Sequence, residues 1–329
     1  MKNLKAAVIG LGIGKQHARA LAAMEGVKLA AVADLRQDVA AQVAQQYGCK
    51  ASGDGAGLLE SEDLDFVCIC TNPLSHLPLT EAAARRGVHV FCEKPMAPSL
   101  EHCDGMIEAC RRAGVKLMIG QKKRFLPAFK FVKSKLEGDF GPAKWCVIRY
   151  ALGRVGLGWF WDEKDGGGPL LENSVHMMDM MRFLIGEVAR VHAEGGNLFN
   201  PDRAPQLDTA AVSLRFKSGA IACIGCGQAS EWAFAGEGTY LSTDKAVVEI
   251  TGPFDNPSLV RYIMRDRADK VVEMPQEPQD AFTLELSHFI ECLRKDRQPA
   301  VTGEVARGSI ALCLAVKQSI RTGASVTLA

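Results

Sequence analysis

The sequence has no long apolar segment, little net charge and no internal repeat. No stretch reaches the ~18 consecutive apolar residues of a membrane-spanning helix. The apolar run near the N-terminus is interrupted by glycines and by Lys15, Gln16 and His17, so we expect no signal peptide. Thirty-nine Lys and Arg against 38 Asp and Glu leave a formal net charge of +1. We therefore expect no general attraction to nucleic acid or to a membrane surface.

The 11 cysteines do not form the pattern of a disulfide framework. Most lie inside apolar runs, as in Cys68-Ile69-Cys70, which predicts buried thiols and a cytoplasmic location. Cys223 and Cys226 have the spacing of a redox motif, but their segment is typical of a strand rather than the start of a helix. We predict neither a thiol redox centre nor a metal site.

A chain of 329 residues is too long for one ordinary core. Short, continuously apolar runs alternate with amphipathic segments as far as residue 120, a pattern that predicts βαβ units and a doubly wound α/β parallel sheet. The predicted strands cover 5–9, 27–33, 65–70, 88–92 and 116–119, and the predicted helices include 37–47, 77–86 and 99–113.

The pattern changes after Gly120. Val212, Leu214 and Phe216 alternate with polar residues, and a turn at 217–219 leads into a further run at 220–228, which predicts antiparallel strands with one solvent-exposed face. We therefore expect a dinucleotide-binding domain over 1–121 and an α+β domain over 122–329. The elements expected in the second domain are helices at 127–136, 169–184, 280–294 and 303–321, a strand at 143–150, and several strands within 189–273.

A glycine-rich turn, Gly10-Leu11-Gly12-Ile13-Gly14, joins the first predicted strand to the first helix. Glycines there allow a tight turn and let backbone N–H groups approach a pyrophosphate at a helix N-terminus. The third glycine comes one residue earlier than in the usual G-x-G-x-x-G pattern, where Lys15 stands instead. The turn predicts dinucleotide binding; the alternative is a structural turn in another kind of α/β sheet.

Asp34 ends the second predicted strand, at the distance where a carboxylate accepts hydrogen bonds from the ribose of a dinucleotide. Its negative charge would repel the 2′-phosphate of NADP, which favours NAD. Arg36 could reach such a phosphate, so NADP is not excluded.

Three polar segments follow predicted strands: Thr71-Asn72-Pro73, Glu93-Lys94-Pro95 and Gln121-Lys122-Lys123-Arg124. Open α/β sheets bind ligands beyond the carboxyl ends of their strands. Lys94 could hydrogen-bond a substrate hydroxyl there, and a cis Lys94–Pro95 bond would hold the side chain towards the cleft. The alternative is a solvated surface turn.

Glu172, His176 and Asp179 stand at positions i, i+4 and i+7 of the predicted helix 169–184, so one face presents all three. Histidine titrates near neutral pH and is the usual general base for an alcohol. The alternative is a surface histidine paired with two acids.

The cations Lys122, Lys123 and Arg124 could recognise an acidic substrate group, or could belong to a solvated loop. Trp159 and Trp161 could form a wall on which a sugar stacks, or could pack the domain.

Taken together, these residues resemble the glucose-fructose oxidoreductase/inositol dehydrogenase (Gfo/Idh/MocA) family over nearly the whole chain. The resemblance rests on an ordered set of motifs rather than on any one of them. These are the glycine turn with His17, Thr71-Asn72-Pro73 with His76, Glu93-Lys94-Pro95, the glycine triplet 166–168 with His176 and Asp179, Asp208-Thr209-Ala210, and Gly303-Glu304 in the last helix pair.

The resemblance implies a Rossmann domain followed by an open-faced, mainly antiparallel sheet whose outer face mediates homodimers or homotetramers. It also implies that Lys94 contacts the nicotinamide ribose and the substrate, and that His176 is the acid/base. Position 172 completes the family's Lys-Asp-His trio, but this chain has Glu172 there, one methylene longer. Ser174 replaces the usual glycine of the family's D-x-G-x-H pattern.

The sequence thus predicts an NAD(P)-dependent oxidoreductase acting on a secondary alcohol of a sugar or inositol-like polyol. The alternatives are a glycosidase or lyase that uses transient oxidation by NAD, and a non-catalytic dinucleotide-binding sensor or repressor. The predicted catalytic residues are Lys94, His176 and Glu172. The predicted substrate-binding residues are Lys94, Lys123, Arg124, Trp161, Glu172, Asn173 and His176. The predicted cofactor-binding residues are Gly10, Gly12, Ile13, Gly14, Asp34, Leu35, Arg36, Thr71, Asn72, Pro73, His76, Glu93, Lys94 and Gln121.

Overall fold

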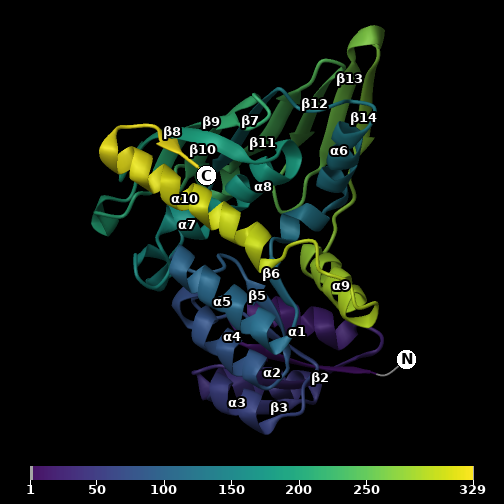
Figure 1. Cartoon of the computed structure of the whole chain (residues 1–329), viewed down its shortest axis with the longest axis vertical. Coiled ribbons are helices and arrows are strands. Elements are labelled where there is room, and N and C mark those ends of the chain that lie inside the picture. The colour runs from purple at the N-terminus through teal and green to yellow at the C-terminus, as the bar shows by residue number, and fades with distance from the viewer. Residues whose placement is uncertain (1–2, 329) are drawn as a thin grey trace. The chain divides into compact units, whose positions relative to one another are not determined.

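A computed structural model describes residues 3–328 and divides them into two compact units (Figure 1). The first unit comprises the chain up to Lys122 together with 282–307, and the second comprises 123–281 together with the chain from Gly308 onward. The division into domains 1–121 and 122–329 stays a prediction. The segment 282–307, which lies within the predicted second domain, belongs to the first compact unit.

The first unit is built on a six-stranded parallel sheet with the order β3-β2-β1-β4-β5-β6. The order reverses between β1 and β4, as in the doubly wound fold that the sequence predicts. The strands β4, β5 and β6 are almost completely buried because helices cover both faces of the sheet, whereas the edge strand β3 has no buried residue. The strands are β1 (Leu4–Ile9), β2 (Val27–Ala33), β3 (Lys50–Ser52), β4 (Phe66–Ile69), β5 (His89–Glu93) and β6 (Leu117–Gly120).

Helices connect these strands, and glycines in the left-handed conformation end two of them. Gly48 follows α2 and Gly114 follows α5, each with positive φ. Asp54 and Ser99 cap the N-termini of α3 and α5 by accepting backbone N–H groups. The helices are α1 (Gly14–Ala23), α2 (Gln37–Tyr47), α3 (Gly55–Ser61), α4 (His76–Arg85) and α5 (Leu100–Ala113).

A helix from late in the chain, α9 (Ala281–Arg294), completes the first unit. The ring of Phe289 packs edge-on against Phe66 of β4, with centroids 5.7 Å apart, and against Phe91 of β5 at 5.9 Å. Phe282 packs in the same way against His17 of α1. This aromatic contact is the physical reason why 282–307 belongs with the parallel sheet.

The second unit contains a nine-stranded sheet with the order β14-β13-β12-β11-β7-β10-β9-β8-β15. All neighbouring strands are antiparallel except β7 and β10, which confirms the predicted mainly antiparallel sheet. The strands are β7 (Trp145–Ala151), β8 (Val188–Gly196), β9 (Thr209–Phe216), β10 (Ile221–Gly227), β11 (Gly236–Ser242), β12 (Ala246–Thr251), β13 (Leu259–Met264), β14 (Val271–Pro275) and β15 (Val326–Thr327).

One face of this sheet is buried and the other is exposed. Buried residues alternate with exposed ones along most of β9 and β10, as the sequence predicts for a sheet with one solvent-exposed face. On the buried face, Ser319 of α10 accepts a hydrogen bond from the backbone N–H of Ala193 in β8 at 3.0 Å. The helices of this part of the chain are α6 (Pro127–Glu137), α7 (Pro169–Glu172), α8 (Val175–Ile185) and α10 (Gly303–Thr322).

The predicted helix 169–184 is interrupted in the structure. It consists of the single turn α7 and the longer α8, separated by Asn173 and Ser174. The N–H of Ser174 bonds back to the carbonyl of Pro169, five residues earlier, and the N–H of His176 bonds to Asn173, three residues earlier. This irregular turn changes the geometry between Glu172 and His176 from that of a regular helix. The prediction also left β3, α3 and β15 unassigned.

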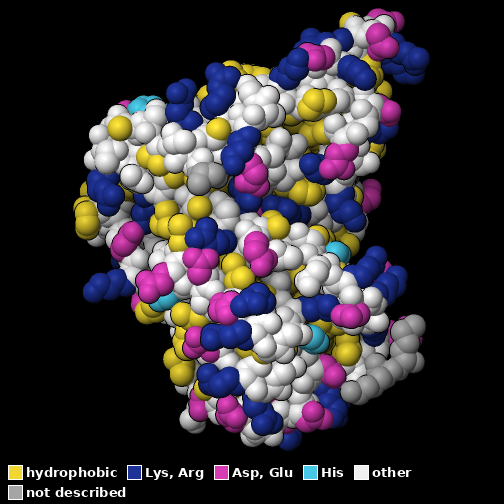
Figure 2. All heavy atoms as spheres, viewed as in Figure 1, with side chains coloured by type: hydrophobic (Ala, Val, Ile, Leu, Met, Phe, Trp, Pro, Cys, Tyr) yellow, Lys and Arg dark blue, Asp and Glu magenta, His cyan; other side chains and the backbone are white. Residues whose placement is uncertain are grey.

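Charged side chains of both signs are interspersed over the face shown in Figure 2, in line with the small net charge. No helix among residues 3–328 combines the length and the apolar character needed to cross a membrane.

Candidate active site

The polar segments predicted in the first unit all lie at one edge of its sheet. Gly10 follows β1, Thr71 follows β4, Lys94 follows β5 and Gln121 follows β6, and these four strands are neighbours. Because the strands are parallel, their carboxyl ends meet along this edge, where doubly wound sheets bind ligands.

The three glycines of the first turn have different structural roles. Gly10 has φ of +88°, and a Cβ there would lie 2.6 Å from the carbonyl oxygen of Cys70. A Cβ on Gly14 would lie 3.0 Å from Val8 Cγ1, so this glycine allows α1 to pack closely on β1. A Cβ on Gly12 would meet no described atom within 4 Å, which leaves its backbone open to a ligand. Gly14 thus fills the packing role of the third glycine despite its early position, and Lys15 is exposed.

Asp34 is bonded to the glycine turn. Its Oδ2 accepts the backbone N–H of Leu11 at 2.7 Å, and its Oδ1 accepts the backbone N–H of Arg36 at 2.9 Å and Arg36 Nε at 3.2 Å. Burial opposes ionisation of this carboxyl, but these hydrogen bonds and the Arg36 charge outweigh it and lower its pKa. Asp34 is therefore held ionised beside the turn, as ribose recognition requires. Arg36 is paired with the same carboxylate.

Other features at this edge fit a dinucleotide. Leu35 is 92% exposed and Ile13 is 45% exposed, so two apolar side chains beside the turn are open to solvent. Gln121 is buried, and its Oε1 has no hydrogen-bond partner among the described residues. A buried acceptor without a donor is costly, and a ligand hydroxyl or amide could supply one. The residues present therefore fit NAD.

Lys94 leaves the sheet from a tightly held turn. The Lys94–Pro95 peptide bond is cis, as predicted. The Glu93 side chain folds back so that its Oε2 accepts the backbone N–H of Lys94 at 3.0 Å, while its Oε1 lies 2.6 Å from His17 Nε2. Glu93 is 5% exposed.

His76 connects this turn to the neighbouring one. Its Nδ1 lies 3.1 Å from the carbonyl of Met96 and its Nε2 lies 3.1 Å from the carbonyl of Thr71. The ring is fully buried, and burial lowers its pKa. Asn72 and Pro73 start the next helical turn, where Asn72 Oδ1 accepts the Ser75 hydroxyl at 2.5 Å. Since Glu93 and His76 are engaged with the backbone, any effect they have on a cofactor would be exerted through these turns.

In the second unit, Glu172 ends α7 and His176 lies in the first turn of α8; both are buried. Asn173, between them, has a buried Nδ2 without a hydrogen-bond partner among the described residues. The segment thus places a carboxylate, an amide and an imidazole on one short stretch of backbone.

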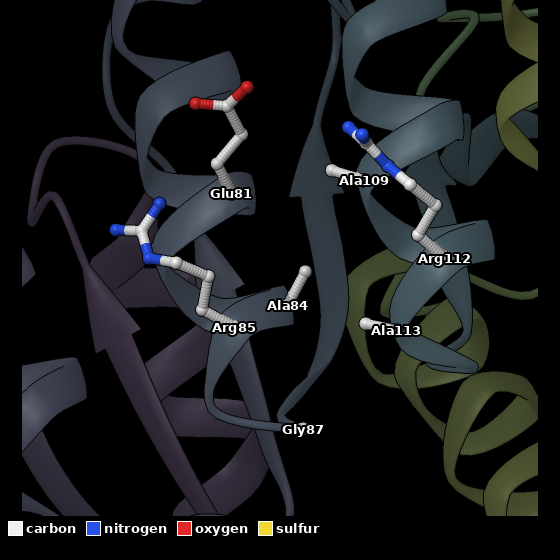
Figure 3. Close-up of a pocket in the computed structure, with 7 residues that line it drawn as sticks. All are labelled: Glu81, Ala84, Arg85, Gly87, Ala109, Arg112 and Ala113. Carbon is white, nitrogen blue, oxygen red and sulfur yellow. The ribbon is translucent and has the colours of Figure 1, made fainter.

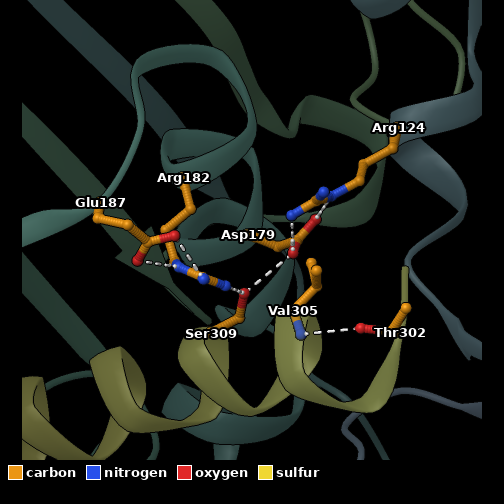
Figure 4. A network of polar contacts seen from close by, with 7 residues as sticks. All are labelled: Arg124, Asp179, Arg182, Glu187, Thr302, Val305 and Ser309. Carbon is orange, nitrogen blue, oxygen red and sulfur yellow. Dashed lines mark hydrogen bonds and ion pairs between the residues drawn. The ribbon is translucent and has the colours of Figure 1, made fainter. Parts of the chain in front are cut away.

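Asp179 and Arg124, both singled out from the sequence, bind each other (Figure 4). Asp179 Oδ2 accepts Arg124 Nε at 2.6 Å, and Oδ1 accepts Arg124 Nη2 at 2.7 Å and the Ser309 hydroxyl at 2.9 Å. Asp179 is 1% exposed. This bidentate pair engages the Arg124 guanidinium, so its predicted substrate role requires competition with Asp179.

Lys123 is also paired. Its Nζ lies 2.8 Å from Asp255 Oδ1 and 5.0 Å from the ring centroids of Tyr150 and Phe254. Burial raises the pKa of Tyr150 well above its usual value, with further contributions from the negative charges of Asp255, Glu237 and Glu172. Sequence reasoning did not single out Tyr150, Glu237 or Asp255, because they come from separate strands and loops and share no motif.

Trp161 is buried, and its Nε1 donates to the carbonyl of Val155 at 2.8 Å. Its ring packs against Phe160, with centroids 5.5 Å apart.

A surface groove of the described chain lies away from this edge. A groove of about 600 Å³ runs between α4 and α5, with Ala84, Ala109 and Ala113 between the helices and Glu81, Arg85 and Arg112 around them (Figure 3). It reaches Gly87, which precedes β5, so it lies at the amino end of that strand. It is therefore separate from the edge that carries Gly10 and Lys94.

Comparison with known proteins identifies the chain. A family model described as the oxidoreductase family with an NAD-binding Rossmann fold matches residues 4–121, and a Gfo/Idh/MocA C-terminal domain matches 132–246. The chain belongs to the Gfo/Idh/MocA oxidoreductase family. The cofactor of its first domain is NAD, in agreement with the environment of Asp34.

Among relatives of this Gfo/Idh/MocA protein, myo-inositol 2-dehydrogenase of Thermotoga maritima is 31% identical and covers 99% of this chain and 98% of its own. D-apiose dehydrogenase of Paraburkholderia graminis is 30% identical over 100% of this chain and 90% of its own. The crystal structure of a probable dehydrogenase from Thermotoga maritima superposes with a TM-score of 0.86 at 29% identity, covering 98% of both chains.

Proposed function

We propose that this protein is an NAD-dependent dehydrogenase that transfers a hydride between nicotinamide and a secondary alcohol, or the matching ketone, of a sugar or inositol-like polyol. The observation that carries the proposal is the full-length similarity to dehydrogenases named for myo-inositol and D-apiose. The ionised Asp34 on the glycine turn supports NAD over NADP, because a 2′-phosphate would meet a like charge.

We propose that Lys94, His176 and Glu172 are the catalytic residues. Bound NAD supplies the hydride acceptor. His176 takes the hydroxyl proton as the hydride leaves the carbon that bears this hydroxyl, so the alcohol loses one proton and one hydride and becomes a ketone. Lys94 polarises the substrate oxygen by donating a hydrogen bond, and Glu172 orients the acid/base. Reduction is the same chemistry in reverse.

The cofactor-binding role of the strand-end segments is part of the same proposal. The glycine turn would hold the pyrophosphate and Asp34 the adenosine ribose, and Ile13 and Leu35 would offer apolar contact. Gln121 and the turns at Thr71-Asn72-Pro73 and Glu93-Lys94 would border the nicotinamide half. We further propose that Asn173, Lys123, Arg124 and Trp161 shape the substrate site.

We propose a cytoplasmic homodimer or homotetramer that assembles through the exposed face of the nine-stranded sheet. The supporting observation is a set of half-exposed apolar side chains on that face, Trp145, Ile221 and Tyr240. The cytoplasmic location is supported by the eleven cysteines, all of which are free thiols in the described chain.

The test is a panel of inositols, aldoses and sugar acids assayed with NAD and with NADP, followed by absorbance of the reduced cofactor. Lys94→Ala and His176→Ala, assayed on the best substrate, should each lose about 10²–10⁴-fold in kcat, the usual contribution of a positioned proton-transfer group. Both should bind NADH within a few-fold of the wild-type protein.

Two outcomes would overturn the proposal. Full activity of either variant on the true substrate would remove that residue from the mechanism. Tightly retained NAD without net NADH formation would instead point to elimination driven by transient oxidation.

A further inference from the structure

A buried polar cluster lies behind the Lys94 turn, entirely within the first unit. It consists of His17 on α1, Glu93 at the end of β5 and Glu285 on α9, which are 0%, 5% and 0% exposed. The nitrogen and oxygen atoms that these residues offer lie within 4.8 Å of one another. Two carboxylates and an imidazole at this depth need a physical reason, since buried charges are costly unless they are paired.

The contact between His17 and Glu93 is a direct hydrogen bond. The separation of 2.6 Å between His17 Nε2 and Glu93 Oε1 is shorter than the about 3.3 Å between two neighbouring ligands of a tetrahedral zinc ion. A carboxylate can only accept, so Nε2 carries the hydrogen and donates it. His17 Nδ1 has no hydrogen-bond partner in the described chain.

Water is kept away from this bond by aromatic rings. Phe91 lies 5.2 Å and Phe282 lies 5.1 Å from the centroid of the His17 ring. Burial therefore opposes ionisation of Glu93, but the hydrogen bond and charge of His17, followed by the charges of Lys94 and Lys122, outweigh it and lower the pKa of Glu93. The hydrogen bond from His17 is the largest of the favourable contributions.

The other groups that face Glu93 come from every element packed around it. Glu285 on α9 adds a second carboxylate, and burial keeps the thiols Cys68, Cys70 and Cys92 protonated by raising their pKa values. On α4, burial lowers the pKa of His76, which disfavours a second positive charge beside Glu93. Lys122 lies over the Phe282 ring at 4.3 Å and supplies positive charge.

The second oxygen of Glu93 reaches the residue that matters for the reaction. Oε2 accepts the backbone N–H of Lys94 at 3.0 Å, so the carboxylate closes a small ring over its own following peptide. A line of two hydrogen bonds therefore runs from His17 through Glu93 to the backbone of Lys94.

We infer that His17 is a positioning residue: by holding Glu93 in place as a carboxylate, it fixes the backbone from which Lys94 projects. The inference rests on the proposed role of Lys94 in the reaction. Without His17, the buried carboxyl loses its strongest partner, takes up a proton at higher pH and no longer restrains the Lys94 N–H as an ionised acceptor.

The test compares His17→Leu, His17→Gln, Glu93→Gln and the double variant His17→Leu/Glu93→Gln, each as the full chain. His17→Leu should lower kcat by about 10–100-fold, the range expected for the loss of a charge-assisted hydrogen bond. NADH affinity, measured by fluorescence, should change by less than about threefold, because the glycine turn and Asp34 are untouched. A variant that had merely unfolded would lose both.

The pH profile gives the sharper readout. The kcat of His17→Leu divided by the wild-type kcat, measured at each pH, cancels the ionisations that both enzymes share. Because the folded pKa of Glu93 is depressed, the ionised form prevails above it and is lost as pH falls. Removing His17 raises this pKa, so the ratio should fall as pH is lowered through the raised pKa. The kcat of the double variant divided by the kcat of Glu93→Gln should not change with pH, because the amide at position 93 does not titrate.

Conservative replacement and a matched control complete the design. His17→Gln keeps a donor and should recover most of kcat. His89→Leu removes a half-buried histidine at the opposite end of β5, where its Nδ1 accepts the backbone N–H of Lys116. This control should keep kcat within about twofold of wild type, and its kcat relative to wild type should not change with pH.

The inference fails if His17→Leu folds, binds NADH and turns over at the wild-type rate, or if its pH ratio is flat. It also fails if His17→Gln is no better than His17→Leu. Lys94→Ala separates this from the proposed function. If Lys94→Ala is inactive while His17→Leu is fully active, only the positioning role is wrong; if Lys94→Ala is active, the proposed mechanism itself is wrong.

Discussion

Two carboxylate side chains in the first unit hold nearby backbone turns by accepting hydrogen bonds from backbone N–H groups. Asp34 accepts the N–H of Leu11, and Glu93 accepts the N–H of Lys94. In both cases a carboxylate at a strand end holds the turn from which ligand contacts are expected. Hydrogen bonds to charged groups are stronger than neutral ones, so these two residues affect both geometry and electrostatics.

Replacement of Asp34 by alanine should raise KM for NAD by about 10–100-fold, because about 1.5–3 kcal/mol of charge-assisted hydrogen bonding is lost. KM for NADP should rise less, since the like charge that opposes a 2′-phosphate is removed. Steady-state kinetics with both cofactors measures the change in preference.

The exposed Asp38, in the first turn of α2, provides the control. Asp38→Asn should leave both KM values within about twofold. Equal loss of NAD and NADP use in Asp34→Ala would show that the residue only supports the turn.

At the scale of elements, the connection from β1 to α1 carries residues proposed to bind NAD, and the interrupted helix α7–α8 carries two residues proposed to act in catalysis. The sequence pattern predicts one continuous helix over 169–184, but it does not predict the break at Asn173 and Ser174. That break depends on backbone hydrogen bonds to Pro169 and Asn173, which an apolar pattern does not encode. The sequence also could not show the role of Gly14, the third glycine of the turn, which comes one residue early. Only the close packing of α1 on β1 in the structure shows that Gly14 takes the packing role of the usual third glycine.

The glycine turn yields a paired prediction. Gly12→Ala should keep the free energy of unfolding within about 0.5 kcal/mol of wild type, because its Cβ would meet no described atom. NADH should nevertheless bind at least about tenfold more weakly, because the methyl group would enter the space of the pyrophosphate. Fluorescence titration and thermal unfolding measure the two effects.

Gly14→Ala is the matched control, for which we expect a loss of stability rather than a specific loss of NADH affinity. Its Cβ would lie 3.0 Å from Val8 Cγ1 and 3.1 Å from Cys70 Cβ, so overpacking should cost about 1–3 kcal/mol of stability. Unaltered NADH binding by Gly12→Ala would contradict the assignment of this turn to the cofactor.

At the scale of the whole molecule, the chain returns late to its first unit, and the nine-stranded sheet leaves one face open. Trp145 of β7 and Tyr240 of β11 make an edge-to-face contact on that face, with ring centroids 5.8 Å apart. Exposed aromatic residues of this kind are enriched at interfaces.

The double substitution Trp145→Glu/Tyr240→Glu should therefore reduce the assembly by at least one step, from tetramer to dimer or from dimer to monomer. Two like charges buried at a symmetric interface would be repeated on both partners and left unpaired. Size-exclusion chromatography with light scattering measures the mass.

Leu198→Glu, at a 69% exposed position in the loop between β8 and β9, should not change the mass. A monomeric wild-type protein at micromolar concentration, or an unchanged mass in the double variant, would contradict assembly through this face.

Local sequence patterns were sufficient to predict much of the fold of this protein. Continuous apolar strands, intervening helices and the spacing from the glycine turn to Asp34 predicted the doubly wound sheet and its cofactor, because these features depend on residues near one another in sequence. The alternating strand pairs of the second unit were predictable for the same reason.

Contacts between residues far apart in sequence were decided only by the tertiary structure. The bond between His17 and Glu93 spans 76 positions, the pair of Lys123 with Asp255 spans 132, and α9 joins the first unit through Phe289. Sequence periodicity does not encode such pairs, because two distant charged groups come within hydrogen-bond distance only when the strands and helices that carry them pack together.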